Sequence, residues 1–425
     1  MHGPWSSRGV PLLRLSDSSR SVFAALAAAA AAIVAWRLIG DAWATLGDGR
    51  YYHAMAAGAV GEVPFAFRPL VPAVVRALPG PIPGGFAAVT FASLGAATAA
   101  VGWLARRRGG AAPDARFALA FWLGSFVVAL SATAPVRIDA ALAFALAGLF
   151  ALAAKPTRPV VLGAALGASV LVHELALFAL AALWIDRLTG STWISPRPLT
   201  WRPLLGLTAF AGAVFAGVRA WVEPAAATLP ATYASASMAT LVAYVLDYTG
   251  GPIKHGLRVF AAFGPVLLYA VASVTRRGRR DALGAVVLVG LAAGLTLLAT
   301  DTLRVMAVLT VPVVLEGARF VSRLWSSRRL LALAALAVQL AYSVTVFGHL
   351  QTFEGSLALH GIAGTLSAAG LAIAVAGARE LARSPTRSGG GGGPPAPGRA
   401  RPLPGSAPAP RRTRPARRTP AVPLQ

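Results

Sequence analysis

One short stretch of the chain combines residue types that could carry out acid–base chemistry. Residues 47–56 read GDGRYYHAMA, with Asp48 just ahead of two tyrosines. A carboxylate here could accept a proton from an attacking hydroxyl group. Asp48 could also be the N-cap of a short helix lying along a membrane, with Tyr51, Met55 and Val60 on one face. The two roles are compatible, and both place Asp48 at a membrane–water boundary.

Three arginines occupy similar settings and could bind a phosphate group. Arg68 lies within the sequence FRPLVP, Arg137 precedes one apolar run, and Arg304 begins another. A guanidinium can hold a phosphate through two parallel hydrogen bonds, so these positions suit a phosphorylated substrate. Two alternatives stay open. Arg304 could pair with Asp301, three residues earlier on a helix, and Arg137 could be a structural residue.

A histidine–glutamate pair lies in the middle of the apolar stretch 158–187. His173 and Glu174 follow a run of small residues that includes Gly163 and Gly167. Ionisable groups at membrane depth cost about 2.5–3.5 kcal/mol each, so they usually have partners or a function. The pair could cap a helical hairpin, or it could bind a donor, an acceptor or a cation. It is not a zinc motif, because no second histidine follows at the required spacing.

The elements that must position these residues are predicted to be membrane-spanning helices. The chain is 56% hydrophobic and only 13% charged, about half the charged share of a soluble domain. Its net charge of +24 would by itself suggest a nucleic-acid partner, but the low charge content excludes a soluble nucleic-acid-binding domain. The sequence therefore predicts an all-α, polytopic membrane helix bundle. Apolar runs of spanning length occur near 21–40, 83–105, 116–133, 138–154, 200–222, 256–275, 281–300, 303–325, 328–349 and 360–382.

The distribution of basic residues predicts the orientation of the bundle. Arginine-rich segments such as 106–108 and 276–280 all fall on the cytoplasmic side if 158–187 is a hairpin of two short helices. If 158–187 were one long span, every later basic loop would face outward. We therefore expect about twelve membrane segments with both termini in the cytoplasm. A cleaved signal peptide over 22–44 is a competing interpretation of the start of the chain.

This topology divides the chain into three parts. Residues 1–20 form a cytoplasmic N-terminal segment, and residues 21–383 form the transmembrane domain. The first outer loop covers 41–82, and a second long outer loop covers 223–255. Residues 384–425 are rich in Pro, Gly and Arg and contain no acidic residue, so we expect a disordered cytoplasmic tail.

Two motifs of the first outer loop together resemble a known family. The pattern Asp-x-x-Tyr-Tyr-x-x-Met-Ala begins at Asp48, and aromatic-Arg-Pro-Leu-x-Pro contains Arg68. Together they are similar to the integral-membrane GT-C glycosyltransferase superfamily. The first also resembles the Trp-Asp-x-x-(His/Trp)-Tyr pattern of its lipid-phosphate-sugar-dependent mannosyltransferases. Glu174, after a Gly-rich apolar run, matches a charged position that follows the fourth span in that superfamily. The chain departs from the pattern where Gly47 replaces Trp and Arg68 replaces an aromatic residue.

The resemblance implies a GT-C-like bundle and an inverting glycosyltransferase with Asp48 as the base. The donor would be a polyprenyl-phosphate sugar and the acceptor a cell-envelope molecule on the outer face. No metal site is expected, and the need for a divalent cation stays open. The catalytic and substrate-binding side chains should converge on one outward cavity that opens to lipid. The candidate substrate- and phosphate-binding residues are Arg68, Arg137, His173, Glu174, Asp301 and Arg304.

Two other classes of function remain open. A transporter or flippase of an amphiphile would favour internal repeats and charges near mid-membrane on broken helices. A non-catalytic scaffold subunit would need no acid–base residue. The sequence shows no internal repeat and no Walker loop. The expected partners are membrane lipids and a lipid-linked sugar, with no nucleic acid. The arginine-, alanine- and glycine-rich composition suggests a high-GC bacterium, and we expect the inner (plasma) membrane.

Overall fold

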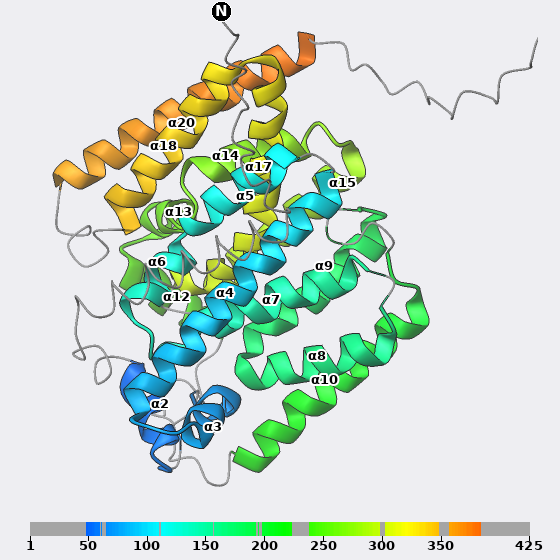
Figure 1. Cartoon of the computed structure of the whole chain (residues 1–425), viewed down its shortest axis with the longest axis vertical. Helices are drawn as coiled ribbons and strands as arrows, with labels where there is room; N and C mark the ends of the chain where they lie inside the picture. Colours follow the sequence, from blue (N-terminus) through cyan, green and yellow to red (C-terminus); the bar gives the residue numbers. More distant parts are fainter. Residues whose placement is uncertain are drawn as a thin grey trace, which may run out of the picture. The chain divides into compact units, whose positions relative to one another are not determined.

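Every regular element that the structure describes is a helix (Figure 1). The computed structural model divides into two compact units, Met1–Leu381 and Ala382–Gln425. The predicted N-terminal segment, the predicted first span and the predicted tail lie outside the described residues. The described residues are 48–59, 61, 65–109, 112–155, 157–192, 194, 198–222, 238–297, 302–347 and 357–383.

The helices follow one another along the first unit. In the first half they are α2 (Gly49–Ala56), η2 (Phe65–Phe67), α3 (Leu70–Ala77), α4 (Ile82–Gly109), α5 (Ala112–Leu123), α6 (Phe126–Thr133), α7 (Asp139–Ala153), α8 (Pro159–Val172), η3 (Glu174–Ala176) and α9 (Leu177–Thr189). In the second half they are α10 (Trp201–Val222), α12 (Met238–Thr249), α13 (Pro252–Ala261), α14 (Pro265–Val274), α15 (Arg279–Thr296), α16 (Thr302–Met306), η4 (Ala307–Leu309), α17 (Thr310–Ser327), α18 (Arg329–Tyr342), η5 (Ser343–Phe347) and α20 (Leu357–Arg383).

The helices confirm a membrane protein with several spans. Five helices are long and apolar enough to cross a bilayer, and the number rises to seven if each of two bent pairs counts as one span. The helix that contains α17 has 89% of its apolar window buried, whereas α10 has 11%. The central position of α17 follows from its packing against α5, α14 and α18. The exposed apolar faces of α10 and α20 suit contact with lipid chains.

Two predicted spans are not single straight helices. The run 116–133 forms α5 and α6, with a bend of 47° between their axes. The run 256–275 forms α13 and α14, with a bend of 81°. At the second bend Gly264 has a φ of 61°, and a Cβ atom there would clash with the Tyr342 ring. Only glycine fits both the left-handed backbone and the close approach. Periodicity alone does not reveal such a contact between distant helices.

The stretch 158–187 is broken near its centre, as the charge distribution predicted. Helix α8 ends at His173, whose φ of −165° and ψ of 134° are extended, and α9 follows after one turn of 3₁₀ helix. The start of α8 follows α7 closely at the end of the bundle marked by Lys155. The segment after α9 hydrogen-bonds to Asp281 at the start of α15, through Ser191 and Thr192. Side chains of α8 and α9 line the same small cavity, so the two helices lie against each other as the arms of a hairpin.

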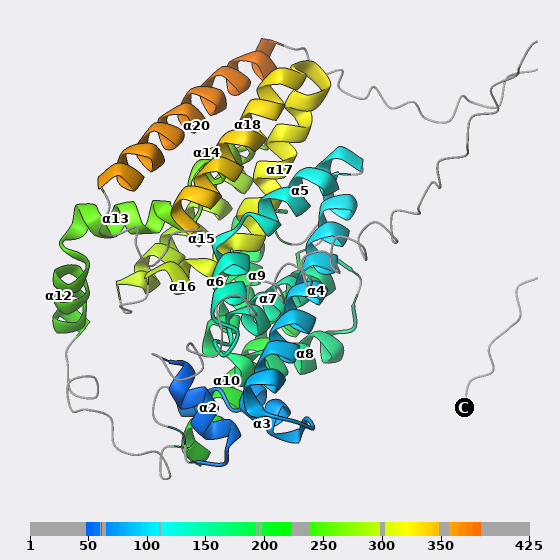
Figure 2. The same cartoon turned by 60° about the vertical axis from the view of Figure 1, so that its left-hand side comes forward.

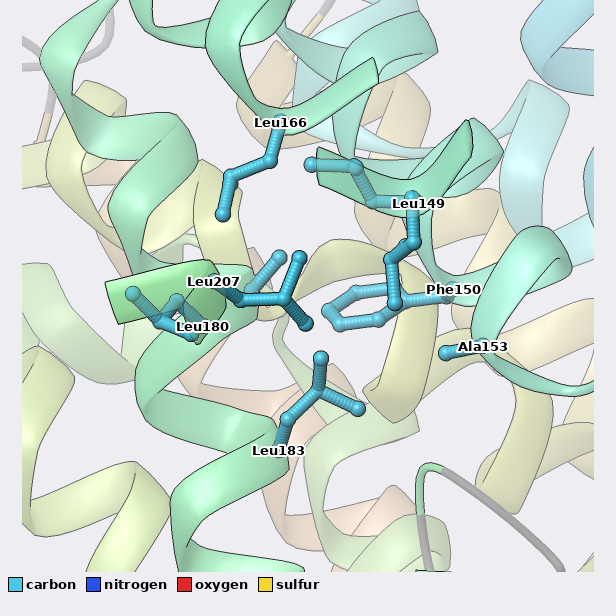
Figure 3. Close-up of a pocket in the computed structure, with 9 residues that line it drawn as sticks. Leu149, Phe150, Ala153, Leu166, Leu180, Leu183 and Leu207 are labelled. Carbon is cyan, nitrogen blue, oxygen red and sulfur yellow. The ribbon is translucent and has the colours of Figure 1, made fainter. Parts of the chain in front are cut away.

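The hairpin packs tightly against its neighbours. A small apolar cavity of about 10 Å³ lies where α7, α8, α9 and α10 meet (Figure 3). It has room for about one water molecule, but its lining offers no polar partner for one. The four helices are therefore joined by packed leucine and phenylalanine side chains, which hold the bend at His173 in place. The labelled lining residues are Leu149, Phe150, Ala153, Leu166, Leu180, Leu183 and Leu207.

Candidate functional site

Helix α2 carries Asp48 immediately before its first residue. The buried face of the helix contains Tyr52 and Ala56, which are one turn apart and pack with α3. Tyr51 and Met55, also one turn apart on α2, are half-buried beside this face, with the Tyr51 ring stacked on Phe65 at 4.4 Å, and Val60 lies outside the described residues. Asp48 holds the N-cap position, but its side chain makes no capping hydrogen bond. That carboxylate is directed to a tertiary partner.

Arg304, in the short helix α16, is that partner. Its Nη1 donates to Asp48 Oδ2, and its Nε lies 2.8 Å from Asp139 Oδ1. Asp139 is 3% exposed and begins α7, where the positive end of the helix dipole favours a carboxylate. One guanidinium therefore bridges two carboxylates from two other helices. The alternative partner Asp301 lies outside the described residues.

Arg68 makes a second bridge close to the first. Its Nε and Nη2 donate to the two oxygens of Glu174 at 2.9 and 2.5 Å, and its Nη1 donates to Tyr52 Oη at 2.7 Å. The two-point contact fixes the carboxylate as well as neutralising it. Through Tyr52 the bridge connects the bend of the α8–α9 hairpin to α2. The structure thus brings Asp48, Arg68, Glu174 and Arg304 together, while their convergence on an outward cavity stays a prediction, because none of the four lines a described pocket.

Two residues close in the chain to members of these bridges each carry a buried polar atom that has no hydrogen-bond partner among the described residues. One is His173 Nε2, and the other is Thr302 Oγ1. The opposite ring nitrogen of His173 lies 3.2 Å from both the Leu175 amide and Glu174 Oε2, which fixes the ring. A buried polar atom without a partner costs about 1–3 kcal/mol. Both atoms are therefore available to a ligand that brings its own donors or acceptors.

Electrostatics define the protonation states at the boundary. Burial raises the pKa of the Asp48 carboxyl, but the charges of Arg304, Arg137 and Arg68 outweigh it and hold the pKa below the ordinary value of 3.8. Burial raises the pKa of Tyr52 to about 12, against the opposing charge of Arg68. At neutral pH Asp48 is therefore a carboxylate and Tyr52 a neutral phenol. The pKa of Arg68 is raised, because the interactions with Tyr52 and Glu174 exceed the opposing effect of burial.

Arg137 differs from the other two arginines. It is half-buried, and no ion pair joins it to an acidic side chain in the part of the chain that the structure describes. Its charge nevertheless acts on Asp48, so it belongs to the same cluster. Arg137 is thus the guanidinium that can take an anion without first giving up a carboxylate.

An apolar groove of about 400 Å³ ends beside this charge cluster. It runs between α3, α4, α7 and α8, and the exposed side chains of Val74 and Phe144 form part of its rim. Val172 lines the groove and directly precedes His173, and Leu70 lies two residues after Arg68. The groove itself is lined by apolar and small side chains, so the charged residues border it and do not line it.

The sequence analysis did not identify two members of the cluster. Tyr52 appeared only within a motif, and Asp139 was not among the candidate residues. Both carried a signal, since Tyr52 lies one helical turn after Asp48 and Asp139 is an acid at the start of an apolar run. Among the described residues, no group of three or more histidine, aspartate or glutamate side chains could hold a metal ion.

No protein-family model, curated protein or solved structure matches the chain. The resemblance to GT-C glycosyltransferases therefore rests on the motifs alone, and the function has to be argued from the chemistry of the cluster.

Proposed function

We propose that the chain is a multi-pass glycosyltransferase that moves a sugar from a polyprenyl-phosphate donor to a cell-envelope acceptor. The observation that carries this proposal is the meeting of an ionised Asp48 and three arginines with one end of an apolar groove. A lipid-linked sugar has a matching sequence of parts, namely an apolar chain, an anionic phosphate and a polar sugar. A groove that borders charge is suited to hold such a molecule by both ends.

The proposed setting follows the charge distribution of the sequence. With about twelve membrane segments and cytoplasmic termini, the Asp48 cluster faces the outer side of the plasma membrane. The sugar would then be transferred outside the cytoplasm, where nucleotide sugars are absent. A donor carried by a membrane lipid meets that requirement.

The residues would divide the work as follows. The lipid chain lies along Val74 and Phe144, and the phosphate contacts Arg137 and then Arg304. The Asp48 carboxylate accepts the proton of the acceptor hydroxyl as its oxygen attacks the anomeric carbon. The bond from that carbon to the phosphate oxygen breaks at the same time, with inversion. The electron pair leaves with polyprenyl phosphate, whose charge the arginines stabilise.

Arg304 would couple donor binding to the strength of the base. In the structure it holds the pKa of Asp48 below 3.8, which makes the carboxylate a weak proton acceptor. A phosphate that draws Arg304 away from Asp48 would allow that pKa to rise toward the operating pH, where general-base catalysis is most efficient. His173 Nε2 and Thr302 Oγ1 would then contact substrate oxygens, with Glu174 keeping the histidine ring in place.

The test is sugar transfer in proteoliposomes supplied with a panel of polyprenyl-phosphate sugars and cell-envelope acceptors. Asp48→Asn should lower the transfer rate about 10²–10⁴-fold, the range of general-base catalysis. Asp247→Asn is the matched control, because Asp247 is exposed on α12 and lies outside the cluster. It should keep the wild-type rate. Equal rates for wild type and Asp48→Asn would remove Asp48 as the base.

A transporter or flippase is the second candidate, and the two bent helix pairs favour it. The bends occur at Gly124 and near Gly264, however, and neither position carries a charge. Lipid movement across the bilayer by wild type and Asp48→Asn alike, with no sugar transfer by either, would support this candidate. A scaffold subunit would show neither activity.

A further inference from the structure

A second open pocket lies far from the Asp48 cluster. It has a volume of about 560 Å³ and lies between the turn that joins α17 to α18 and the last part of α20. Helix α17 begins six residues after Arg304, and the pocket lies at its other end, roughly 27 Å away at 1.5 Å per residue. Figures 1 and 2 both show α20 running alongside α18. The lining residues are Ser327, Arg328, Arg329, Leu330, Leu331, Ala376 and Glu380.

The pocket contains one more positive charge than its acid neutralises. Arg328 Nε lies 3.1 Å from Glu380 Oε1, so this pair is neutral. Arg329 is exposed, and no ion pair joins it to an acid among the residues that the structure describes. Its guanidinium lies over the Trp325 ring at 5.8 Å. The side chain is therefore held at the pocket by a cation–π contact while its charge stays available.

Part of the pocket wall is apolar. Leu330 is 83% exposed, and Leu331 and Ala376 continue the surface along α18 and α20. Trp325 is of the residue type that is enriched at the level of lipid head groups. An exposed cation and an exposed leucine that line the same pocket match a molecule with an anionic head and apolar chains.

We propose that this pocket binds an anionic phospholipid of the surrounding leaflet. The phosphate contacts Arg329, and the acyl chains cover Leu330 and Ala376. Basic pockets between transmembrane helices are known to take such head groups. The arginine-rich loops at this end make it the cytoplasmic end under the positive-inside rule, and the proposal does not depend on the chemistry at Asp48.

Charge complementarity distinguishes this occupant from others. The chain after α20 contains no acidic residue, so it cannot neutralise Arg329. A free anion such as phosphate would satisfy Arg329 but would leave Leu330 exposed to water. An anionic lipid satisfies both parts of the pocket.

The test is thermal unfolding of the full chain in detergent with added lipid. Phosphatidylglycerol should raise the Tm more than phosphatidylcholine with the same acyl chains, because only the former brings net negative charge. Arg329→Gln should lose more than half of this difference. Arg279→Gln is the matched control, since Arg279 is exposed at the start of α15 and does not line the pocket. It should keep the full difference.

Two further variants make the test independent of any folding defect. Ala376→Phe fills the pocket without changing its charge and should also reduce the lipid effect. Glu380→Gln frees the charge of Arg328. It should lower the phosphatidylglycerol concentration that produces half of the maximal rise in Tm. The proposal is overturned if Arg329→Gln keeps the full difference, if Arg279→Gln loses as much, or if inorganic phosphate reproduces the shift.

Discussion

Two arginines of this chain each bridge a pair of carboxylates, at opposite ends of the bundle. Arg304 joins Asp48 and Asp139. Arg277 joins Glu316, at 2.6 Å, and Asp281, at 3.0 Å. Arg304 lies in α16 and Arg277 in the turn between α14 and α15, and in both places at least one acid comes from a more distant helix. A list of charged residues would make the two sites look alike.

They differ in how completely their polar atoms are satisfied. At the Arg277 site the second oxygen of Glu316 accepts from Ser273 Oγ, and the second oxygen of Asp281 accepts from Ser191 Oγ. The side chain of Glu316 is 1% exposed, whereas that of Asp48 is 28% exposed. A closed and fully bonded network stabilises the fold, and it has no capacity left for a ligand.

The Arg304 site is open by comparison. One carboxylate reaches its surface, two buried polar atoms lack partners, and an apolar groove ends beside it. Incomplete satisfaction costs stability, so it is typically retained where a substrate completes the network. The comparison favours a structural role for the Arg277 site and is consistent with the proposed chemistry at the Arg304 site, and the following experiments can separate the two roles.

The largest contrast is expected from removing each arginine. Arg304→Gln should lower the transfer rate about 10²–10³-fold, the effect of losing one oxyanion-stabilising donor. Arg277→Gln leaves Glu316 without its main partner and should cost about 3–5 kcal/mol of unfolding free energy. Transfer per folded molecule should stay at the wild-type level in Arg277→Gln. Unfolding curves and proteoliposome assays on both variants measure this, and an equal loss of transfer in both would end the distinction.

A lysine substitution tests the geometry of the second bridge. Arg68→Lys keeps the charge but loses the two-point contact with Glu174, which is worth about 1.5–3 kcal/mol for charged hydrogen bonds. We expect a loss of transfer of about 10–150-fold at the same conversion. Arg319→Lys is the counterpart, because Arg319 contacts Glu316 through one nitrogen at 3.5 Å. It should change neither transfer nor Tm measurably.

Hydroxyl groups at the two ends should respond with opposite signs. Ser273→Ala removes a hydrogen bond to Glu316 and should destabilise the chain by about 1–3 kcal/mol. Thr302→Val removes a buried hydroxyl without a partner and should leave the stability unchanged or raise it. Transfer should fall in Thr302→Val and not in Ser273→Ala. Thr302 has no role in substrate binding if its valine variant transfers sugar at the wild-type rate.

The smallest effect concerns pH. The pKa of Asp48 is lower in the folded chain than its ordinary value of 3.8 in the unfolded chain. The pair with Arg304 therefore stabilises the fold fully at a pH above 3.8, and this stabilisation is lost as the pH falls through the lower pKa of the folded chain. Asp48 should therefore stay ionised in the free enzyme down to about pH 4. A profile of kcat/KM against pH should show no acid limb from Asp48 near neutrality. An acid limb centred above about pH 5 would contradict the direction of this shift.

Particular residues show where sequence reasoning succeeded and where it stopped. The break at His173 followed from the distribution of arginines, because charge on loops reports sidedness. Local spacing also accounts for the contact of Glu316 with Arg319, since residues three apart on a helix are neighbours. The closer partner of Glu316, however, is Arg277 on another segment. Local spacing identifies a possible pair but not the competitor that packing supplies.

The sequence by itself determined the helical membrane class and the set of ionisable residues near the proposed outer boundary, and its charge distribution favoured a break within 158–187 over one long helix. Those features depend on local hydropathy and on charge along the chain. Only the tertiary structure decided that Asp48 turns from its capping role to Arg304, that Asp139 and Tyr52 join the cluster, and that an apolar groove ends beside it. Ion pairs and grooves depend on which helices meet, and residues as far apart as Asp48 and Arg304 meet only when the bundle is packed.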